Sequence, residues 1–435
     1  MLAPVRGPLL LGLLMTAGGS ASAQESTRLE RRLVAHADSH VAEARALLER
    51  VVNINSGTLN LAGVQRVGEA FRAELDGLGF RTRWEDGAAF QRAGHLIAER
   101  GARGPKVLLI GHLDTVFEQD SPFQRFETLT DTTARGPGII DMKGGDVILI
   151  QALKALAAEG VLDRLRITVV LNGDEELPGE PRSLARQALV QAAQGADVAL
   201  GFEDADGSPH RMVVARRGTS PWRLTVKAAS GHSSQIFRED IGPGAIYETV
   251  RILNGFRERM AGQQYLTVNP GLLLAGTTAT FDSKADRGTA FGKDNVIAGE
   301  AVVTGDLRTI SIEQREQAKR KMQAVLADAG PHTSAVLTFE EGYPPMAPTD
   351  GNQRLLAMYD QVSRDLGFGA VTALDPSRAG AADVSFVAGL VPMILDGLGL
   401  KGQDDHSVLE TADLTTLPMQ IKRAAALLYR IAEGK

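Results

Sequence analysis

The stretch KVLLIGHLD, residues 106–114, decides the fold that the sequence predicts. Residues 107–110 form an unbroken apolar run, which indicates a strand buried on both faces of a sheet. The run ends at Gly111, so His112 and Asp114 follow at the carboxyl end of the strand, where open α/β sheets bind their ligands. Because side chains alternate along a strand, Asp114 is placed to hold one nitrogen of His112 while the other nitrogen faces a metal ion.

Two further apolar runs, residues 165–171 and 197–202, predict buried strands of the same kind. Helices are expected over residues 144–159 and 183–194, and a single amphipathic helix over residues 26–52. Strands that alternate with helices favour a mostly parallel sheet with helices on both faces. The expected fold class is therefore α/β.

The chain of 435 residues is long for a single compact domain. Residues 213–342 show a different pattern of strands and helices, which predicts an inserted α+β domain. Residues 343–435 return to the α/β pattern after the rigid turn Gly342-Tyr343-Pro344-Pro345. The expected catalytic domain thus consists of two segments, residues 24–212 and 343–435.

Residues 1–23 are typical of a secretory signal peptide. Arg6 is the only charged residue among them, residues 9–15 are nearly all apolar, and Ala21-Ser22-Ala23 precedes Gln24 as a small-residue cleavage signature. The apolar run is too short for a membrane span, which needs about 20 residues. We therefore expect cleavage near Ala23–Gln24 and a periplasmic or secreted protein.

The composition limits the chemistry. A net charge of −6 argues against a nucleic-acid-binding protein. The sequence has no cysteine, which excludes disulfides, thiolate ligands and a cysteine nucleophile. Any metal ion must therefore be bound by nitrogen and oxygen atoms.

Acidic and imidazole residues follow each predicted buried strand, and one more pair comes late in the chain. His112, Asp114 and Asp141 follow the strand at 107–110, Glu175 and Glu176 follow the strand at 165–171, and Glu203 and Asp204 follow the strand at 197–202. The late pair is Asp405 and His406. Carboxylates gathered at one edge of a sheet repel each other strongly unless a cation lies among them. Two divalent ions that share a carboxylate would remove this repulsion and would activate a water molecule at neutral pH.

The order and spacing of five motifs resemble the metallopeptidase M20 family, and in particular its glutamate carboxypeptidase-like branch. These motifs are His112-x-Asp114, Gly138-x-x-Asp141-Met142-Lys143-Gly144-Gly145, Glu175-Glu176, Phe202-Glu203 and His406-Ser407. The resemblance spans nearly all of the chain after residue 23. It implies a zinc-peptidase-like catalytic domain and an inserted lid and dimerisation domain.

The resemblance also implies two Zn²⁺ ions per subunit, for which Co²⁺ or Mn²⁺ can substitute. The implied ligands are Asp141 bridging both ions, His112 and Glu203 on one ion, and Glu176 and His406 on the other. Glu175 would be the general base, with Asp114 behind His112. Chemistry agrees, because adjacent glutamates in a loop can point apart, one toward a metal ion and one toward the attacking water.

The inserted domain contributes His232, Asn295 and Arg308 by the same resemblance. His232 would stabilise the oxyanion in the active site of the other subunit of a homodimer, while Asn295 and Arg308 would bind the substrate carboxylate. Simpler interpretations remain open at this point. Arg308 could pair with Asp306, and Asn295 could cap a turn.

Two stretches depart from the pattern of glutamate-specific relatives. The turn Glu340-Glu341-Gly342-Tyr343-Pro344 stands where those relatives carry a turn with an arginine, and its tyrosine cannot form an ion pair with a second carboxylate. Residues 379–383, AGAAD, replace a Gly-Gly-x-Thr-Asp loop, although the preceding Arg378 offers a cation. Specificity for a C-terminal glutamate is therefore not expected.

The sequence thus predicts an exported dizinc hydrolase that cleaves an amide bond next to a free carboxylate in a peptide or N-acyl amino acid. It does not decide between a carboxypeptidase and an N-acyl-amino-acid amidohydrolase. A dizinc aminopeptidase or dipeptidase is one alternative, against which Asn295 and Arg308 argue. A non-catalytic, metal-stabilised binding protein is another, and it would have no need of Glu175.

Overall fold

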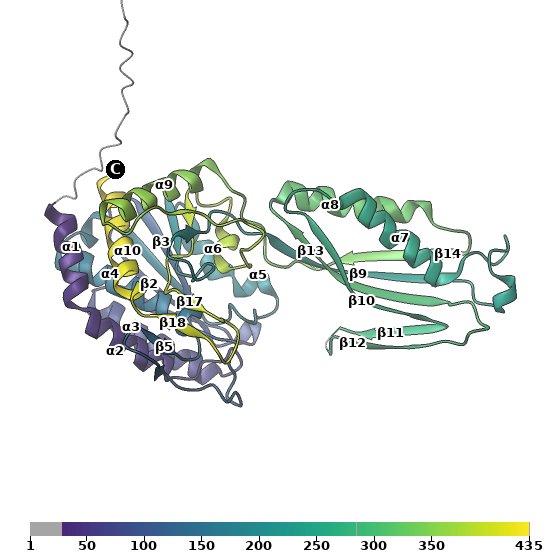
Figure 1. Cartoon of the computed structure of the whole chain (residues 1–435), viewed down its shortest axis with the longest axis horizontal. Coiled ribbons are helices and arrows are strands. Elements are labelled where there is room, and N and C mark those ends of the chain that lie inside the picture. Colours follow the sequence, from purple (N-terminus) through teal and green to yellow (C-terminus); the bar gives the residue numbers. More distant parts are fainter. Residues whose placement is uncertain (1–27, 284, 435) are drawn as a thin grey trace, which may run out of the picture.

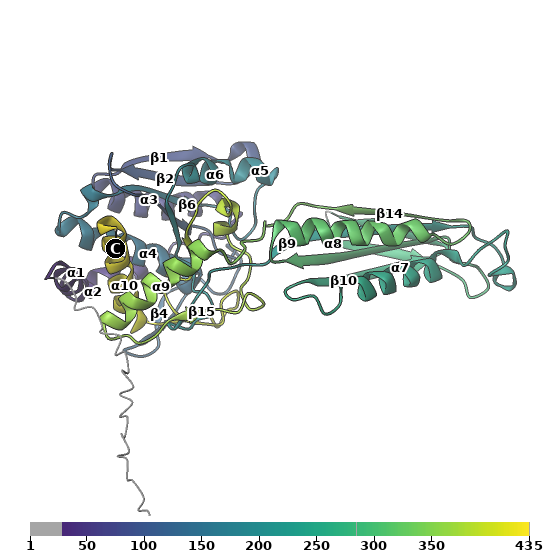
Figure 2. The same ribbon diagram turned by 90° about the horizontal axis from the view of Figure 1, so that it is seen from above.

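The structure is a computed structural model, and it describes residues 28–283 and 285–434. It consists of a larger body and an elongated second body, which lie side by side along the longest axis of the molecule (Figures 1 and 2). The predicted signal segment, residues 1–23, lies outside the described residues. Among the described residues, no helix is long and apolar enough to cross a membrane.

A six-stranded sheet forms the centre of the larger body. Its strand order is β1 (Arg81–Asp86), β2 (Gly94–Arg100), β6 (Arg166–Asn172), β3 (Lys106–His112), β7 (Val198–Gly201) and β16 (Ile394–Leu395). The last four of these strands are parallel, and β1 and β2 are antiparallel additions at one edge. The 107–110 run lies in the middle of the sheet and is almost fully buried. The α/β prediction with a mostly parallel sheet is therefore confirmed.

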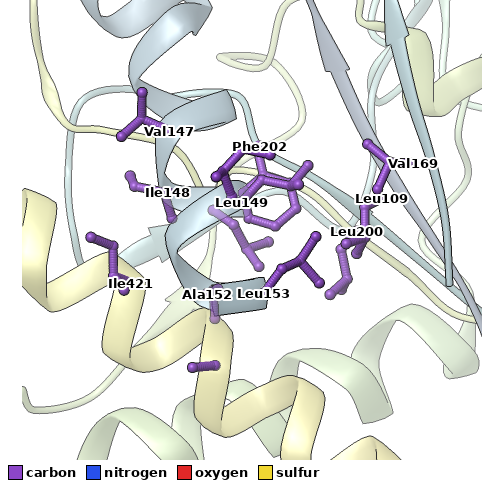
Figure 3. Packing of buried hydrophobic residues seen from close by; sticks show 14 of the residues in the cluster. Leu109, Val147, Ile148, Leu149, Ala152, Leu153, Val169, Leu200, Phe202 and Ile421 are labelled. Carbon is purple, nitrogen blue, oxygen red and sulfur yellow. The ribbon is translucent and has the colours of Figure 1, made fainter. Parts of the chain in front are cut away.

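Helices cover both faces of this sheet. On one face α4 (Gly144–Ala158) packs between the sheet and α10 (Thr416–Glu433), and its apolar side chains meet Leu109, Val169 and Leu200 (Figure 3). Helices α1 (Arg28–Ser39), α2 (Val41–Val52), α3 (Leu61–Gly77) and α9 (Asp350–Asp365) complete this layer. On the other face Leu108 and Ile110 belong to one apolar cluster with Leu189 and Ala193 of α6 (Gln187–Ala193), which follows the short helix α5 (Arg182–Ala185).

The second body is a four-stranded antiparallel sheet with two helices on one side (Figure 1). The strand order is β10 (Thr267–Gly276), β13 (Glu300–Thr309), β9 (Gly218–Ala228) and β14 (Thr333–Phe339), and the helices are α7 (Gly244–Met260) and α8 (Ile312–Val325). Trp222, Leu224, Ile252 and Phe256 form part of its own apolar core. A hairpin, β11 (Thr278–Asp282) and β12 (Arg287–Phe291), extends from it.

The two connections between the bodies pair with each other. Arg216 and Met346 exchange backbone hydrogen bonds of 2.9 and 3.0 Å, and the Thr219 N–H donates to the Tyr343 carbonyl at 2.8 Å. The junction is therefore a short two-stranded ribbon that leads directly to the carboxyl edge of the main sheet.

Several elements differ from the predictions. The single helix expected over residues 26–52 is two helices that break at His40, whose Nδ1 lies 2.8 Å from the His36 carbonyl oxygen. The helix expected over residues 183–194 breaks at Arg186, whose side chain is buried. The strand β10, the hairpin and the very short strands β4 (Glu127–Thr128), β5 (Thr133–Arg135), β15 (Thr372–Ala373), β17 (Gly402–Gln403) and β18 (Thr411–Asp413) were not predicted. The strand predicted over residues 211–215 is shorter, β8 (Arg211–Met212). Strands of two or three residues are too short to show a periodic pattern.

His95 in β2 is buried beside the site and neutral. Its Nε2 lies 2.8 Å from the Ala185 carbonyl oxygen, and the Gly173 N–H donates to its Nδ1 at 3.2 Å. Burial, followed by the charge of Arg186, lowers the pKa of His95 from 6.5 to about 4. Between pH 6.5 and about pH 4 the unfolded chain binds a proton on His95 that the folded chain does not bind. The free energy of unfolding therefore falls as the pH falls through this range.

We expect His95→Gln to remove part of this acid sensitivity, because glutamine keeps a donor for the Ala185 carbonyl but does not titrate. Between pH 7 and pH 5 the wild type should lose about 2 kcal/mol more unfolding free energy than the variant. Denaturant titrations of both proteins at the two pH values measure the difference. Equal losses would show that another group is responsible.

Candidate metal centre

Asp141 lies at the centre of the carboxylate cluster and faces two histidines with its two oxygens. Its Oδ1 is 3.0 Å from Nε2 of His112, and its Oδ2 is 2.9 Å from Nε2 of His406. His112 ends the central strand β3, whereas His406 comes from a loop near the end of the chain. Asp141 is therefore placed to be shared between two neighbouring positions.

Each histidine also meets a second carboxylate. Nε2 of His112 lies 3.7 Å from Oε1 of Glu203, and Nε2 of His406 lies 3.2 Å from Oε2 of Glu176. The two histidine–carboxylate pairs thus share only Asp141. This is the donor set of a dinuclear site with nitrogen and oxygen ligands, and it brings together all five residues that the sequence predicted as metal ligands.

The electrostatics of the cluster also fit a pair of cations. Burial raises the pKa of Glu203 well above its usual value, and burial together with Asp141 raises the pKa of Glu176 to about 7. Hydrogen bonds to Asp141 and Glu176 raise the pKa of His406 to about 11. The buried Oε1 of Glu176 has no hydrogen-bond partner among the described residues. Metal ions bound here would replace the imidazole protons and would stabilise the ionised carboxylates.

Asp114 supports both the His112 side and the glutamate loop. Its Oδ1 is 3.4 Å from Nδ1 of His112 and accepts the N–H of Glu175 at 3.0 Å. Its Oδ2 accepts the N–H of Glu176 at 3.1 Å and the hydroxyl of Thr58 at 2.7 Å. Asp114 therefore contacts His112 from behind, and it also fixes the backbone of both glutamates.

Glu175 lies in the same cavity, and its loop is held from the domain junction. The Tyr343 hydroxyl donates to the Glu175 carbonyl oxygen at 2.8 Å, and Nη2 of Arg186 donates to the Tyr343 oxygen at 3.2 Å. Arg186 in turn forms ion pairs of 2.6 Å with Asp174 and Asp383. The Tyr343 hydroxyl is thus used to position the glutamate loop and is not free to bind a substrate.

Sequence reasoning missed Glu410, which holds the loop of the bridging ligand. This buried carboxylate accepts the N–H groups of Gly138, Ile140 and Asp141 at 2.9, 2.9 and 3.2 Å. Glu410 lies only four residues after His406, so it connects two segments that carry ligands. No pattern in the sequence indicates that this glutamate is buried.

The sequence did not indicate two residues of the cavity wall, Ala205 and Arg216. The cavity has a volume of about 140 Å³ and is lined by Asp141, Glu175, Glu176, Glu203, Asp204, Ala205, Arg216, Gly380, Ala381, Asp405 and His406. Asp405 lies close enough to Asp141 and His406 to be a further ligand. Arg216 is buried and pairs with Asp396 at 2.6 Å.

The three residues of the second body do not reach this cavity within the same chain. Arg308 pairs with Thr219 in the strand register, at the junction end of the sheet, and its Nε donates to Asp306 at 2.5 Å. His232 follows the far end of β9, an eleven-residue strand, and so lies about 33 Å from the junction. The Ser233 N–H donates to the Asn295 carbonyl at 2.9 Å, which places Asn295 beside His232.

Comparisons with known proteins agree with this architecture. The family model of peptidase family M20/M25/M40 matches residues 108–433. The chain is 24% identical over 399 residues to carboxypeptidase G2 from Pseudomonas sp. (strain RS-16), with 89% of each chain covered. It is 26% identical over 398 residues to a succinyl-diaminopimelate desuccinylase from Verminephrobacter eiseniae, which covers 87% of this chain and 92% of that protein.

Solved structures share the fold. Aminopeptidase PepT from Bacillus cereus superposes with a TM-score of 0.71 at 16% identity, covering 93% of this chain and 99% of the other. A dinuclear metal-binding peptidase of the M20 family from Bacillus subtilis superposes with a TM-score of 0.61 at 15% identity, covering 91% and 99%. With a family match over most of its length, the chain belongs to peptidase family M20/M25/M40 and is a metallohydrolase.

Proposed function

We propose that this protein is an exported hydrolase with two zinc ions that cleaves the amide bond next to a free carboxylate in a peptide or N-acyl amino acid. The observation that carries the proposal is the position of Asp141, which offers one oxygen to His112 and the other to His406. When bound, two divalent ions polarise the amide carbonyl and lower the pKa of a water molecule. Nitrogen and carboxylate ligands suit zinc.

The residues of the chain supply the proton transfers and the orientation. Glu175 lines the cavity and is placed to take a proton from the attacking water and to deliver it to the leaving nitrogen. Burial raises the pKa of Glu175 well above its usual value, which makes the carboxylate a stronger base. Asp114 holds the backbone of Glu175, so the carboxylate keeps its place during both transfers.

A second candidate is a dizinc aminopeptidase, and one observation favours it. Asp204 and Asp405 line the cavity in addition to the predicted ligands, and either could bind a substrate ammonium group. The two candidates differ in their response to a blocked amino group. An aminopeptidase loses activity when the amino group of the substrate is acylated, whereas the proposed enzyme retains it.

We also propose that a second copy of the chain completes each site, because His232 lies far from the cavity of its own chain. The exposed apolar side chains Ile246, Tyr247 and Val250 lie along α7, and β10 is an open edge of its sheet. A groove of about 650 Å³ between α7 and β10 continues this surface. Exposed apolar surface of this kind is typical of protein interfaces, and a homodimer through the inserted domain would bury it.

The first prediction from this proposal concerns Glu175 as the general base. Glu175→Gln should keep both metal ions but lower kcat by several orders of magnitude, because an amide cannot take a proton from water. Elemental analysis and turnover of one N-acyl amino acid measure the two quantities. Glu180→Gln changes an exposed glutamate of the same loop and serves as the control. Near-normal turnover of the Glu175 variant would remove this residue from the mechanism.

The second prediction concerns the homodimer. His232→Ala should lower the rate by about 10²–10³, the usual effect of losing one oxyanion donor, while both ions stay bound. Equal mixing with Glu175→Gln should restore about a quarter of wild-type activity, because half of the dimers are mixed and one of their two sites is intact. No recovery after demonstrated subunit exchange would show that His232 does not act across the dimer.

The third prediction concerns export. Residues 1–23 resemble a cleavable signal peptide, so the mature protein should begin at or near Gln24. Its intact mass, measured on protein from the periplasm or medium of the native cell, decides the question. A full-length species confined to the cytoplasm would overturn the proposal.

A further inference from the structure

Large apolar side chains that are exposed to solvent occur in the segments that carry the residues of the candidate metal centre. Five of them, which we call the apolar rim, are between 37% and 60% exposed: Leu59, Val116, Leu177, Val408 and Leu409. None belongs to the apolar cores of the described residues. A single exposed leucine needs no explanation, but a group of them at one site marks a binding surface.

Three members of the rim come from segments that meet at one carboxylate oxygen. Oδ2 of Asp114 accepts both the Thr58 hydroxyl and the Glu176 N–H. Leu59 directly follows Thr58, and Leu177 directly follows Glu176. Val116 lies two residues after Asp114 itself. These three side chains therefore project from the immediate surroundings of the ligand Glu176.

The other two members come from the opposite ligand loop. Val408 and Leu409 are the second and third residues after His406, whose Nε2 lies 3.2 Å from Oε2 of Glu176. The rim residues thus belong to the two segments that contribute Glu176 and His406, and to the chain next to them. A substrate whose scissile amide lies at the cluster would extend across it.

The charges around the rim disfavour an anionic group. Three cations beside the segments of the rim already have partners: Nε of Arg92 donates to the Leu177 carbonyl, Arg182 donates to the Glu341 carbonyl and pairs with Glu180, and Lys401 donates to the Asp204 and Gly397 carbonyls. The carboxylate of Glu118 lies beside Leu59 and accepts its N–H at 2.9 Å, and Asp404 and Asp405 precede His406. A second carboxylate on the substrate would meet apolar surface and negative charge.

We propose that the acyl group of the substrate is neutral and apolar, such as an aliphatic chain of six or more carbons, and that it lies on the apolar rim. This inference rests on the proposed function and narrows it to N-acyl amino acids with hydrophobic acyl groups. Water adds its oxygen to the acyl carbon, the C–N bond breaks, and the nitrogen takes the proton. The products are a carboxylic acid with an apolar tail and a free amino acid.

The substrate class differs from those in the names of the relatives. A desuccinylase removes an acyl group that ends in a second carboxylate. At the rim of this protein that carboxylate would lose its hydration without gaining a cation. Butanoyl and succinyl groups have the same number of carbons, so a comparison between them isolates the effect of the charge.

The test uses the mature enzyme loaded with zinc and N-acetyl, N-butanoyl, N-hexanoyl, N-decanoyl and N-succinyl derivatives of phenylalanine and of glutamate. We expect kcat/KM to rise about two- to fourfold per methylene from acetyl to hexanoyl, since each partly buried CH₂ contributes up to about that factor. The succinyl compounds should be at least about tenfold poorer than the butanoyl compounds. A flat series, or a preference for succinyl, overturns the inference.

Substitutions in the apolar rim test whether these residues cause the preference for longer acyl chains. The double variant Leu59→Ser/Leu177→Ser should lower kcat/KM for the hexanoyl compound about tenfold more than for the acetyl compound. Leu409→Ser on the opposite loop should reduce the same ratio by itself. Leu129→Ser changes an equally exposed leucine away from the site and is the control. An unchanged chain-length ratio in both rim variants, with metal content and melting temperature retained, contradicts the assignment.

The outcomes separate this inference from the proposed function. Hydrolysis of N-acyl amino acids without a chain-length preference leaves the proposed function in place and refutes the assignment of the apolar rim as the binding surface for the acyl group. No hydrolysis of any N-acyl compound by the zinc-loaded enzyme, together with hydrolysis of peptides that have a free amino group and a blocked carboxyl group, refutes both and favours the aminopeptidase.

Discussion

The mutual repulsion of buried carboxylates at one edge of the main sheet is the constraint on which the rest of the structure depends. Asp141, Glu175, Glu176 and Glu203 all line one cavity of about 140 Å³. Such a group of carboxylates stays fully ionised near neutral pH only if cations lie among them. His112 and His406 supply positive charge from two sides, and a pair of metal ions would supply more.

The surrounding structure keeps these groups in place through hydrogen bonds to the backbone. Asp114 holds the N–H groups of Glu175 and Glu176, and Glu410 holds the loop that carries Asp141. Tyr343 extends this support to the junction with the second body, because its hydroxyl donates to the Glu175 carbonyl. A change in the position of the second body would therefore reach the proposed base through this hydrogen bond.

The sequence was sufficient to predict the fold class and the five residues that gather around the proposed ions, because strand ends and motif spacing are local properties. It did not reveal Glu410 or the pairing of Arg186 with Asp383, which join residues far apart in the chain. Contacts of this kind depend on tertiary packing, which periodicity and composition do not encode.

The central claim is that Asp141 bridges two metal ions. A crystal structure of the zinc-loaded mature protein, with anomalous scattering recorded at the zinc absorption edge, tests it most directly. The account predicts two peaks, one between Asp141, His112 and Glu203 and the other between Asp141, Glu176 and His406. A single peak, or no peak in contact with Asp141, would contradict it.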